Sequence, residues 1–141
     1  MIPKTTLLCR MPIASLSGYG EWSRQIMYAI LKSKLADLFD INIWPCNWGH
    51  TALTALDESN EMNDLFKKVI SKPQLTSQPD VFMTITVPSE FQKVGKFNIG
   101  ITAACETDRI SKEWIDKINQ ETDCVFAISK CTAEMMKGTK Y

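Results

Sequence analysis

The chain has 141 residues, of which 45% are hydrophobic and 23% are charged, a composition typical of a globular domain with a sizeable core. Sixteen basic residues balance sixteen acidic ones, which argues against nucleic acid or an anionic membrane surface as the main partner. No apolar run approaches the ~20 residues of a membrane-spanning helix, and no secretion signal precedes the first apolar run. The five cysteines are scattered and odd in number, so we expect a reduced, cytoplasmic protein.

Apolar runs of strand length alternate with helical patterns along the chain. The strand-like runs are residues 5–9, 39–44, 80–86, 97–104 and 124–129, and the helix-like ones are 22–38, 60–70, 112 onward and 130–137. Asn60 and Pro73 mark the start and the stop of the second helix. This order predicts an α/β fold, a Rossmann-like three-layer sandwich with a mainly parallel sheet, and residues 1–141 are expected to form a single domain.

The first strand leads into a glycine-containing loop, Ser17-Gly18-Tyr19-Gly20, at the start of a helix. Glycines there let the backbone approach a phosphate, and the helix N-terminus supplies N–H donors. NAD binding is disfavoured because the loop before Gly18 is too long for a tight Rossmann turn, and Asp40 opens the second strand instead of closing it. Two interpretations remain, a ligand-facing loop of another type or a turn that only caps the helix. If the loop faces a phosphate, we expect Gly20→Val to weaken that ligand and to leave the fold intact.

A second polar segment follows the fourth strand-like run. It contains Glu106, Thr107, Asp108 and Arg109, and two carboxylates with an arginine can bind hydroxyls and phosphates. Ligands of parallel sheets usually lie at the carboxyl ends of the strands, which is where this segment begins. The alternative is a helix entry in which Asp108 or Ser111 is the cap and Arg109 is solvated. Local chemistry does not decide between the two.

The remaining candidates are weaker. Cys46 and His50 supply only half of a zinc site, so a histidine in a polar loop is favoured and no metal is expected. Trp44, Trp48 and Trp114 could stack on a sugar or a base, although tryptophan near the end of an element usually only packs. The single histidine has no patterned partner for a catalytic triad, and there is no P-loop, so no catalytic residue is assigned.

These motifs resemble the group 1 glycosyltransferases of the GT-B type. The stretch from Ser17 to Arg24 is similar to the glycine-rich N-terminal loop of that family. Residues 102–114 resemble its pattern of an acidic E-T-D segment followed by a short helix that begins near a tryptophan. In residues 118–129, Asn119 and Asp123 precede a strand that Ser129 follows, which is similar to a stretch of the family that leads towards the crossover between its two domains. Ser111 departs from the family, whose members often have proline there.

The resemblance implies the N-terminal, acceptor-side half of an enzyme that transfers a sugar from a nucleotide-sugar donor to an unidentified acceptor. The chain ends about where the second, donor-binding domain of the family begins, so we expect little activity without that domain. By analogy, the Ser17–Gly20 loop approaches the donor diphosphate and Glu106–Asp108 lines the acceptor side. No cofactor is expected, because helix N-termini and basic side chains stabilise the leaving diphosphate in such enzymes.

Two alternatives differ in class from a transferase domain. One is a stand-alone α/β module that binds a sugar or a nucleotide without turnover. The other is an interacting protein that buries its exposed face in a homo-oligomer. A large exposed apolar surface near the C-terminus would indicate a missing partner, either a C-terminal domain or a second copy.

Overall fold

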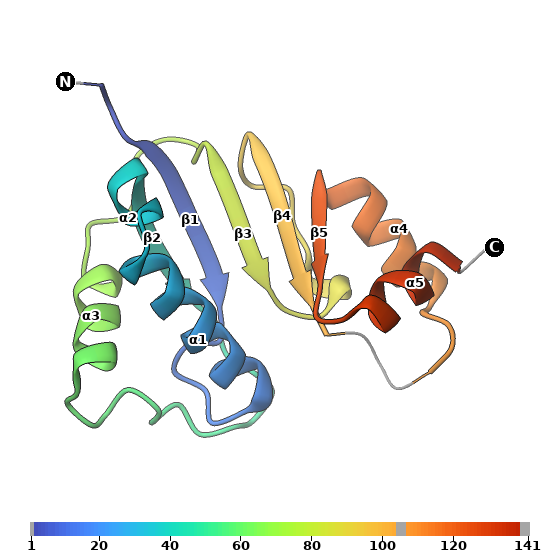
Figure 1. The fold of residues 1–141 in the computed structure, drawn as a ribbon, viewed down its shortest axis with the longest axis horizontal. Coiled ribbons are helices and arrows are strands. Elements are labelled where there is room, and N and C mark those ends of the chain that lie inside the picture. The colour runs from blue at the N-terminus through green and yellow to red at the C-terminus, as the bar shows by residue number, and fades with distance from the viewer. Residues whose placement is uncertain (1, 104–106, 139–141) are drawn as a thin grey trace.

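The computed structural model describes residues 2–103 and 107–138, and the chain forms a parallel sheet covered by helices (Figure 1). The strands of the described residues are β1 (Thr5–Met11), β2 (Phe39–Pro45), β3 (Val81–Ile85), β4 (Phe97–Thr102) and β5 (Cys124–Ala127). They form one sheet in the order β2-β1-β3-β4-β5, and every pair is parallel. The predicted α/β fold is therefore confirmed.

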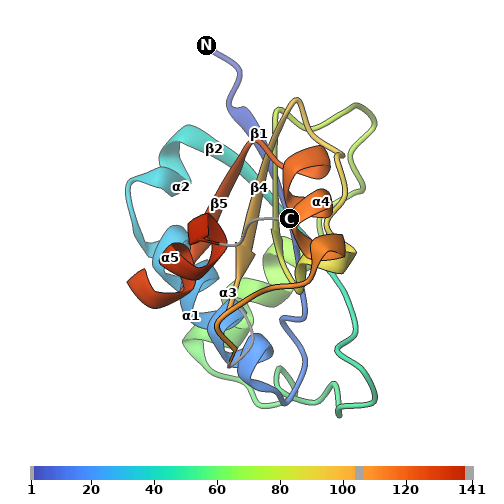
Figure 2. The ribbon, with the colours of Figure 1, turned by 90° about the vertical axis from the view of Figure 1, so that its right-hand side faces the viewer.

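Helices connect the strands and cover both faces of the sheet. They are α1 (Gly18–Lys32), α2 (Leu35–Leu38), α3 (Glu61–Ile70), the 3-10 turn η1 (Pro88–Glu90), α4 (Lys112–Glu121) and α5 (Lys130–Gly138). Figure 2 shows α1, α2 and α5 on one side of the sheet and α4 on the other. Helix α3 lies beside β2 and contacts α1. An ion pair of 2.6 Å between Lys32 Nζ of α1 and Glu61 Oε1 of α3 joins the two helices.

The first helical pattern of the sequence contains two helices. The side chain and the N–H of Ser33 both bond to the carbonyl of Ile30, at 2.8 and 3.2 Å, and Leu35 N–H donates to Ser33 Oγ at 3.1 Å. A serine that bonds to the neighbouring backbone in this way competes with the helix, so α1 ends there. The other helix starts follow the sequence closely, since Asn60 caps α3 and Ser111, not Asp108, caps α4.

The hydrophobic core lies between the sheet and α1. Leu7, Cys9 and Met11 alternate along β1 and pack with Met27 of α1 and Phe66 of α3. Cys9 is fully buried, and burial raises the pKa of its thiol far above the ordinary value. This cysteine therefore acts as a small hydrophobic side chain of the core.

The two edges of the sheet differ. The β2 edge is flanked by α3, whereas β5 is the last strand of the sheet and leaves Phe126 and Ile128 each 54% exposed. The helices of residues 2–103 and 107–138 include none with the length and apolar character of a membrane-spanning segment.

Candidate functional site

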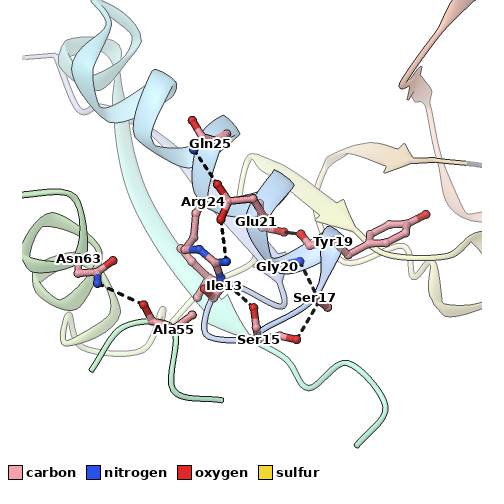
Figure 3. Close-up of polar contacts among 11 residues, drawn as sticks. Ile13, Ser15, Ser17, Tyr19, Gly20, Glu21, Arg24, Gln25, Ala55 and Asn63 are labelled. Carbon is pink, nitrogen blue, oxygen red and sulfur yellow. Dashed lines mark hydrogen bonds and ion pairs between the residues drawn. The ribbon is translucent and has the colours of Figure 1, made fainter. Parts of the chain in front are cut away.

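The candidate site begins in the loop between β1 and α1, which folds around a buried arginine. Arg24 Nη1 donates to the carbonyls of Ile13 and Ser15, both at 2.9 Å, and Arg24 Nη2 lies 2.9 Å from Glu21 Oε2 (Figure 3). Hydrogen bonds from Gln25 and Arg24 lower the pKa of Glu21. Arg24 ends the stretch that resembles the glycine-rich loop of the glycosyltransferases, and its role was not predicted. Its three-residue spacing from Glu21, which places both on one helix face, is a signal that could have indicated the pair.

A second loop, residues 46–59, supports the first. Leu16 N–H donates to the carbonyl of Ala52 at 2.9 Å, and Ala55 N–H donates to the carbonyl of Ala14 at 3.1 Å. The buried side chain of Asn63, in α3, donates in turn to the Ala55 carbonyl at 3.2 Å (Figure 3). The loop that precedes α1 is therefore fixed by backbone contacts on one side and by Arg24 on the other.

Ser17 serves the local structure of this loop. Its Oγ accepts a hydrogen bond of 3.0 Å from Gly20 N–H, the arrangement of a helix N-cap, and a second bond of 2.8 Å from Ser15 Oγ (Figure 3). Ser15 Oγ also contacts Thr51 Oγ1. The interpretation of a turn that caps the helix is thus correct for the Ser17 side chain.

Gly18 and Gly20 both lie in the first turn of α1 and have different roles. A Cβ at Gly20 would lie 2.1 Å from the carbonyl oxygen of Ser15, so only glycine lets the helix approach the loop this closely. The expectation that Gly20→Val leaves the fold intact is therefore wrong, because the added atoms collide with backbone. A Cβ at Gly18, in contrast, would meet nothing within 4 Å. Gly18 is exposed at the first position of α1, where the helix N–H groups have no intrahelical acceptor.

Tyr19 connects the start of α1 to the carboxyl end of β4, the strand that precedes the acidic segment. Its Oη lies 3.1 Å from Thr102 Oγ1, at the end of β4, and accepts a hydrogen bond of 2.9 Å from Ala103 N–H. The ring stacks on Trp48 with the ring centroids 4.1 Å apart and meets Trp22 edge-on at 5.9 Å. Trp48 thus packs against the protein, and the start of α1 is fixed to the carboxyl end of β4.

The acidic segment lies just beyond this contact. Glu106 lies outside the described residues, while Thr107 and Asp108 are exposed. Thr107 Oγ1 donates to the carbonyl of Arg109, and the buried side chain of Ile110 fixes the segment before α4 begins. The contacts of Tyr19 with Thr102 and Ala103 hold the glycine loop against the end of β4, three residues before the acidic segment begins.

The remaining candidates do not assemble into a metal centre. Among the described residues, no group of three or more histidine, cysteine, aspartate or glutamate side chains is close enough to hold a metal ion. His50 is exposed in a turn, and Cys46 is half-buried with a pKa raised chiefly by burial. What the edge offers a ligand is the N-terminus of α1, with its partial positive charge, beside hydroxyl groups.

Comparison of the chain with protein-family models, with curated proteins and with solved structures gives no match.

Proposed function

We propose that the chain is the acceptor-side domain of a glycosyltransferase of the GT-B type, in which the diphosphate of a nucleotide-sugar approaches the N-terminus of α1. The resemblance of the glycine loop and of residues 102–114 to that family is the basis of the proposal. One observation supports it most. Tyr19 joins these two segments at the carboxyl edge of a parallel sheet, where ligands of such sheets are usually bound.

Within this proposal, the first turn of α1 stabilises negative charge. Gly18 leaves the approach to the helix N-terminus open, since no atom outside its chain neighbours and the backbone of α1 lies within 4 Å of the position a Cβ would take. Gly20 and Arg24 hold the loop in shape, and Thr107 and Asp108 lie on the acceptor side. The leaving diphosphate is stabilised by N–H groups and basic side chains, without a requirement for a metal ion.

Turnover requires a second domain that holds the nucleotide-sugar, in the same chain or in another. The exposed Phe126 and Ile128 beside β5 agree with a further contact at this end of the molecule. We propose a cytoplasmic location, and the free thiols of Cys9, Cys46, Cys124 and Cys131 among the described residues agree with it.

The proposal is tested by calorimetric titration of the chain with a panel of nucleotide-diphosphate sugars. Gly18→Glu puts a carboxylate at the helix N-terminus, at a position where an added Cβ meets nothing within 4 Å, and we expect it to weaken binding of the donor by about tenfold through repulsion of the diphosphate. Gln92→Glu adds the same charge at an exposed position of another loop and serves as the matched control. The proposal fails if no donor binds the wild-type chain, or if the two variants bind a donor equally well.

A further inference from the structure

A cavity of about 430 Å³ lies beside β2, away from the start of α1. Its lining comes from β1, β2, the last two residues of α3 and the segment that follows α3. Pockets for small molecules have volumes of roughly 300–1,000 Å³ and combine apolar walls with a few polar groups. We propose that this cavity is a second binding site, one that takes a neutral, flat heteroaromatic ring such as the base of a nucleoside. The site is independent of the proposed transferase function.

The floor of the cavity belongs to the sheet face opposite the core. Leu8 and Asn42 are paired in the register of β1 and β2, and both line the cavity. Ile41 and Ile43, the neighbours of Asn42 along β2, are buried in the hydrophobic core, although Ile43 also borders the cavity. Alternation along the strand therefore places the one carboxamide of β2 on the face opposite the core. Asn42 is 7% exposed, and its Nδ2 makes a long hydrogen bond of 3.3 Å to the carbonyl of Asp40. A carboxamide offers a donor and an acceptor side by side, which matches the edge of a nucleobase.

One wall of the cavity is an aromatic ring that the protein holds in place and leaves accessible. Trp44 is 44% exposed although it lies within a strand of the sheet. Phe82 packs against it with the ring centroids 6.3 Å apart, and the guanidinium of Arg10 lies 5.5 Å from the centre of the Trp44 ring. Arg10 is itself held by Glu90 at 3.4 Å. An indole fixed in this way provides a stacking surface without the cost of ordering it when a ligand binds.

The charge of the lining indicates that a phosphate group is not what this cavity recognises in its ligand. Lys72 is the one charged side chain among the described lining residues. Its Nζ pairs with Asp40 Oδ1 at 2.8 Å and donates to the carbonyl of Ile41 at 2.7 Å, so its charge is already compensated. Pro73 and Pro79 add rigid apolar surface to the lining. A neutral nucleoside therefore fits the lining better than a nucleotide does.

The test is a calorimetric titration with adenosine and uridine, with ribose as a ligand that lacks the ring. We expect a nucleoside to bind saturably and ribose not to bind. Trp44→Leu is expected to weaken the binding by about tenfold, because base stacking on an aromatic side chain is lost. Phe97→Leu is the matched control, since Phe97 is 46% exposed against 44% for Trp44 and does not line the cavity.

Two further variants distinguish nucleoside binding in this cavity from the effects of misfolding and from binding at the proposed donor site. Ser77→Phe fills the cavity from an exposed position, keeps Trp44 in place, and is expected to abolish nucleoside binding. Gly18→Glu is expected to bind nucleosides as the wild type does. The inference is overturned if neither nucleoside binds, if Ser77→Phe binds as the wild type does, or if Trp44→Leu and Phe97→Leu behave alike.

Discussion

Gly18 and Gly20 are two positions apart in the sequence, and the structure gives them opposite constraints. Gly20 is enclosed by the carbonyl groups of Pro12 and Ser15, whereas Gly18 borders open space. The glycine pattern in the sequence suggested one shared purpose, the approach of a phosphate. Only Gly18 has the surroundings that such a purpose requires, and Gly20 is needed for packing.

This contrast predicts different effects of the same substitution. We expect Gly20→Ala to lower the free energy of unfolding by about 1–3 kcal/mol, because the new methyl group forces the helix away from the loop. Gly18→Ala, which meets no atom, is expected to stabilise the chain by about 0.5–1 kcal/mol through the higher helix propensity of alanine. Urea unfolding of the two variants measures both values. Equal stabilities would show that Gly20 is not packed as described.

At the scale of the elements, sequence patterns predicted most of the fold. Apolar runs placed every strand to within a few residues, and cap residues such as Asn60 marked the helix starts. The break at Ser33 was not predicted, because Leu35 and Leu38 continue the apolar pattern of α1. Both of these leucines are exposed, at 45% and 62%, so the pattern there does not reflect burial. A polar bond between a side chain and the backbone, not hydrophobicity, ends the helix.

The candidate site was predictable only in its local parts. The glycine loop and the segment after β4 could be identified because each has its own pattern of residues. The hydrogen bond between Tyr19 and Thr102 joins positions 83 residues apart, and no local pattern carries that information. The role of residues 46–59 was missed for the same reason, since their contacts to Ala14 and Leu16 run mainly through backbone groups.

The cap of α3 gives a prediction for one element. Asn60 accepts a hydrogen bond of 2.8 Å from Asn63 N–H, and Asn60→Ala removes it. We expect a loss of about 1 kcal/mol in the free energy of unfolding, the usual effect of removing an N-cap. Asn47→Ala, at an exposed position outside the helices, is the control and is expected to change stability by less than about 0.5 kcal/mol. If the two variants are equally stable, the cap does not contribute to the stability of α3.

At the scale of the whole molecule, two aspartates join strands at their amino ends. Asp80 accepts hydrogen bonds from Lys96 Nζ at 2.7 Å and from Thr6 N–H at 3.0 Å, and Asp123 accepts one of 2.8 Å from Asn98 N–H. The hydrogen bond from Lys96 lowers the pKa of Asp80 the most, and the bond from Thr6 lowers it further. The hydrogen bonds from Asn98 lower the pKa of Asp123. A carboxyl group with a lower pKa in the folded state than in the unfolded state stabilises the fold when it is ionised.

The stability of the chain is therefore expected to fall in acid. The contribution of both aspartates is fully present above the unfolded-state pKa of about 4 and is lost as the pH falls through the lower folded-state values. Asp80→Asn/Asp123→Asn is expected to be less stable than the wild type near neutral pH and to depend less on pH between about pH 5 and 2. Urea midpoints measured across this range test both points, with the exposed Asp57→Asn as control. A double variant that keeps the full pH dependence of the wild type would contradict the assignment.

The position of β1 constrains the order in which the chain can fold as it leaves the ribosome. Of the described strands, β1 is synthesised before the others and lies inside the sheet, between β2 and β3, so one of its edges stays unpaired until the chain has emerged as far as Ile85. From that point β4 and β5 are added one after the other on the same side, in the order of their synthesis. A nascent chain that has not emerged as far as Ile85 therefore leaves one edge of β1 without a partner strand. After that point, β4 pairs with the open edge of β3, and β5 pairs with the open edge of β4.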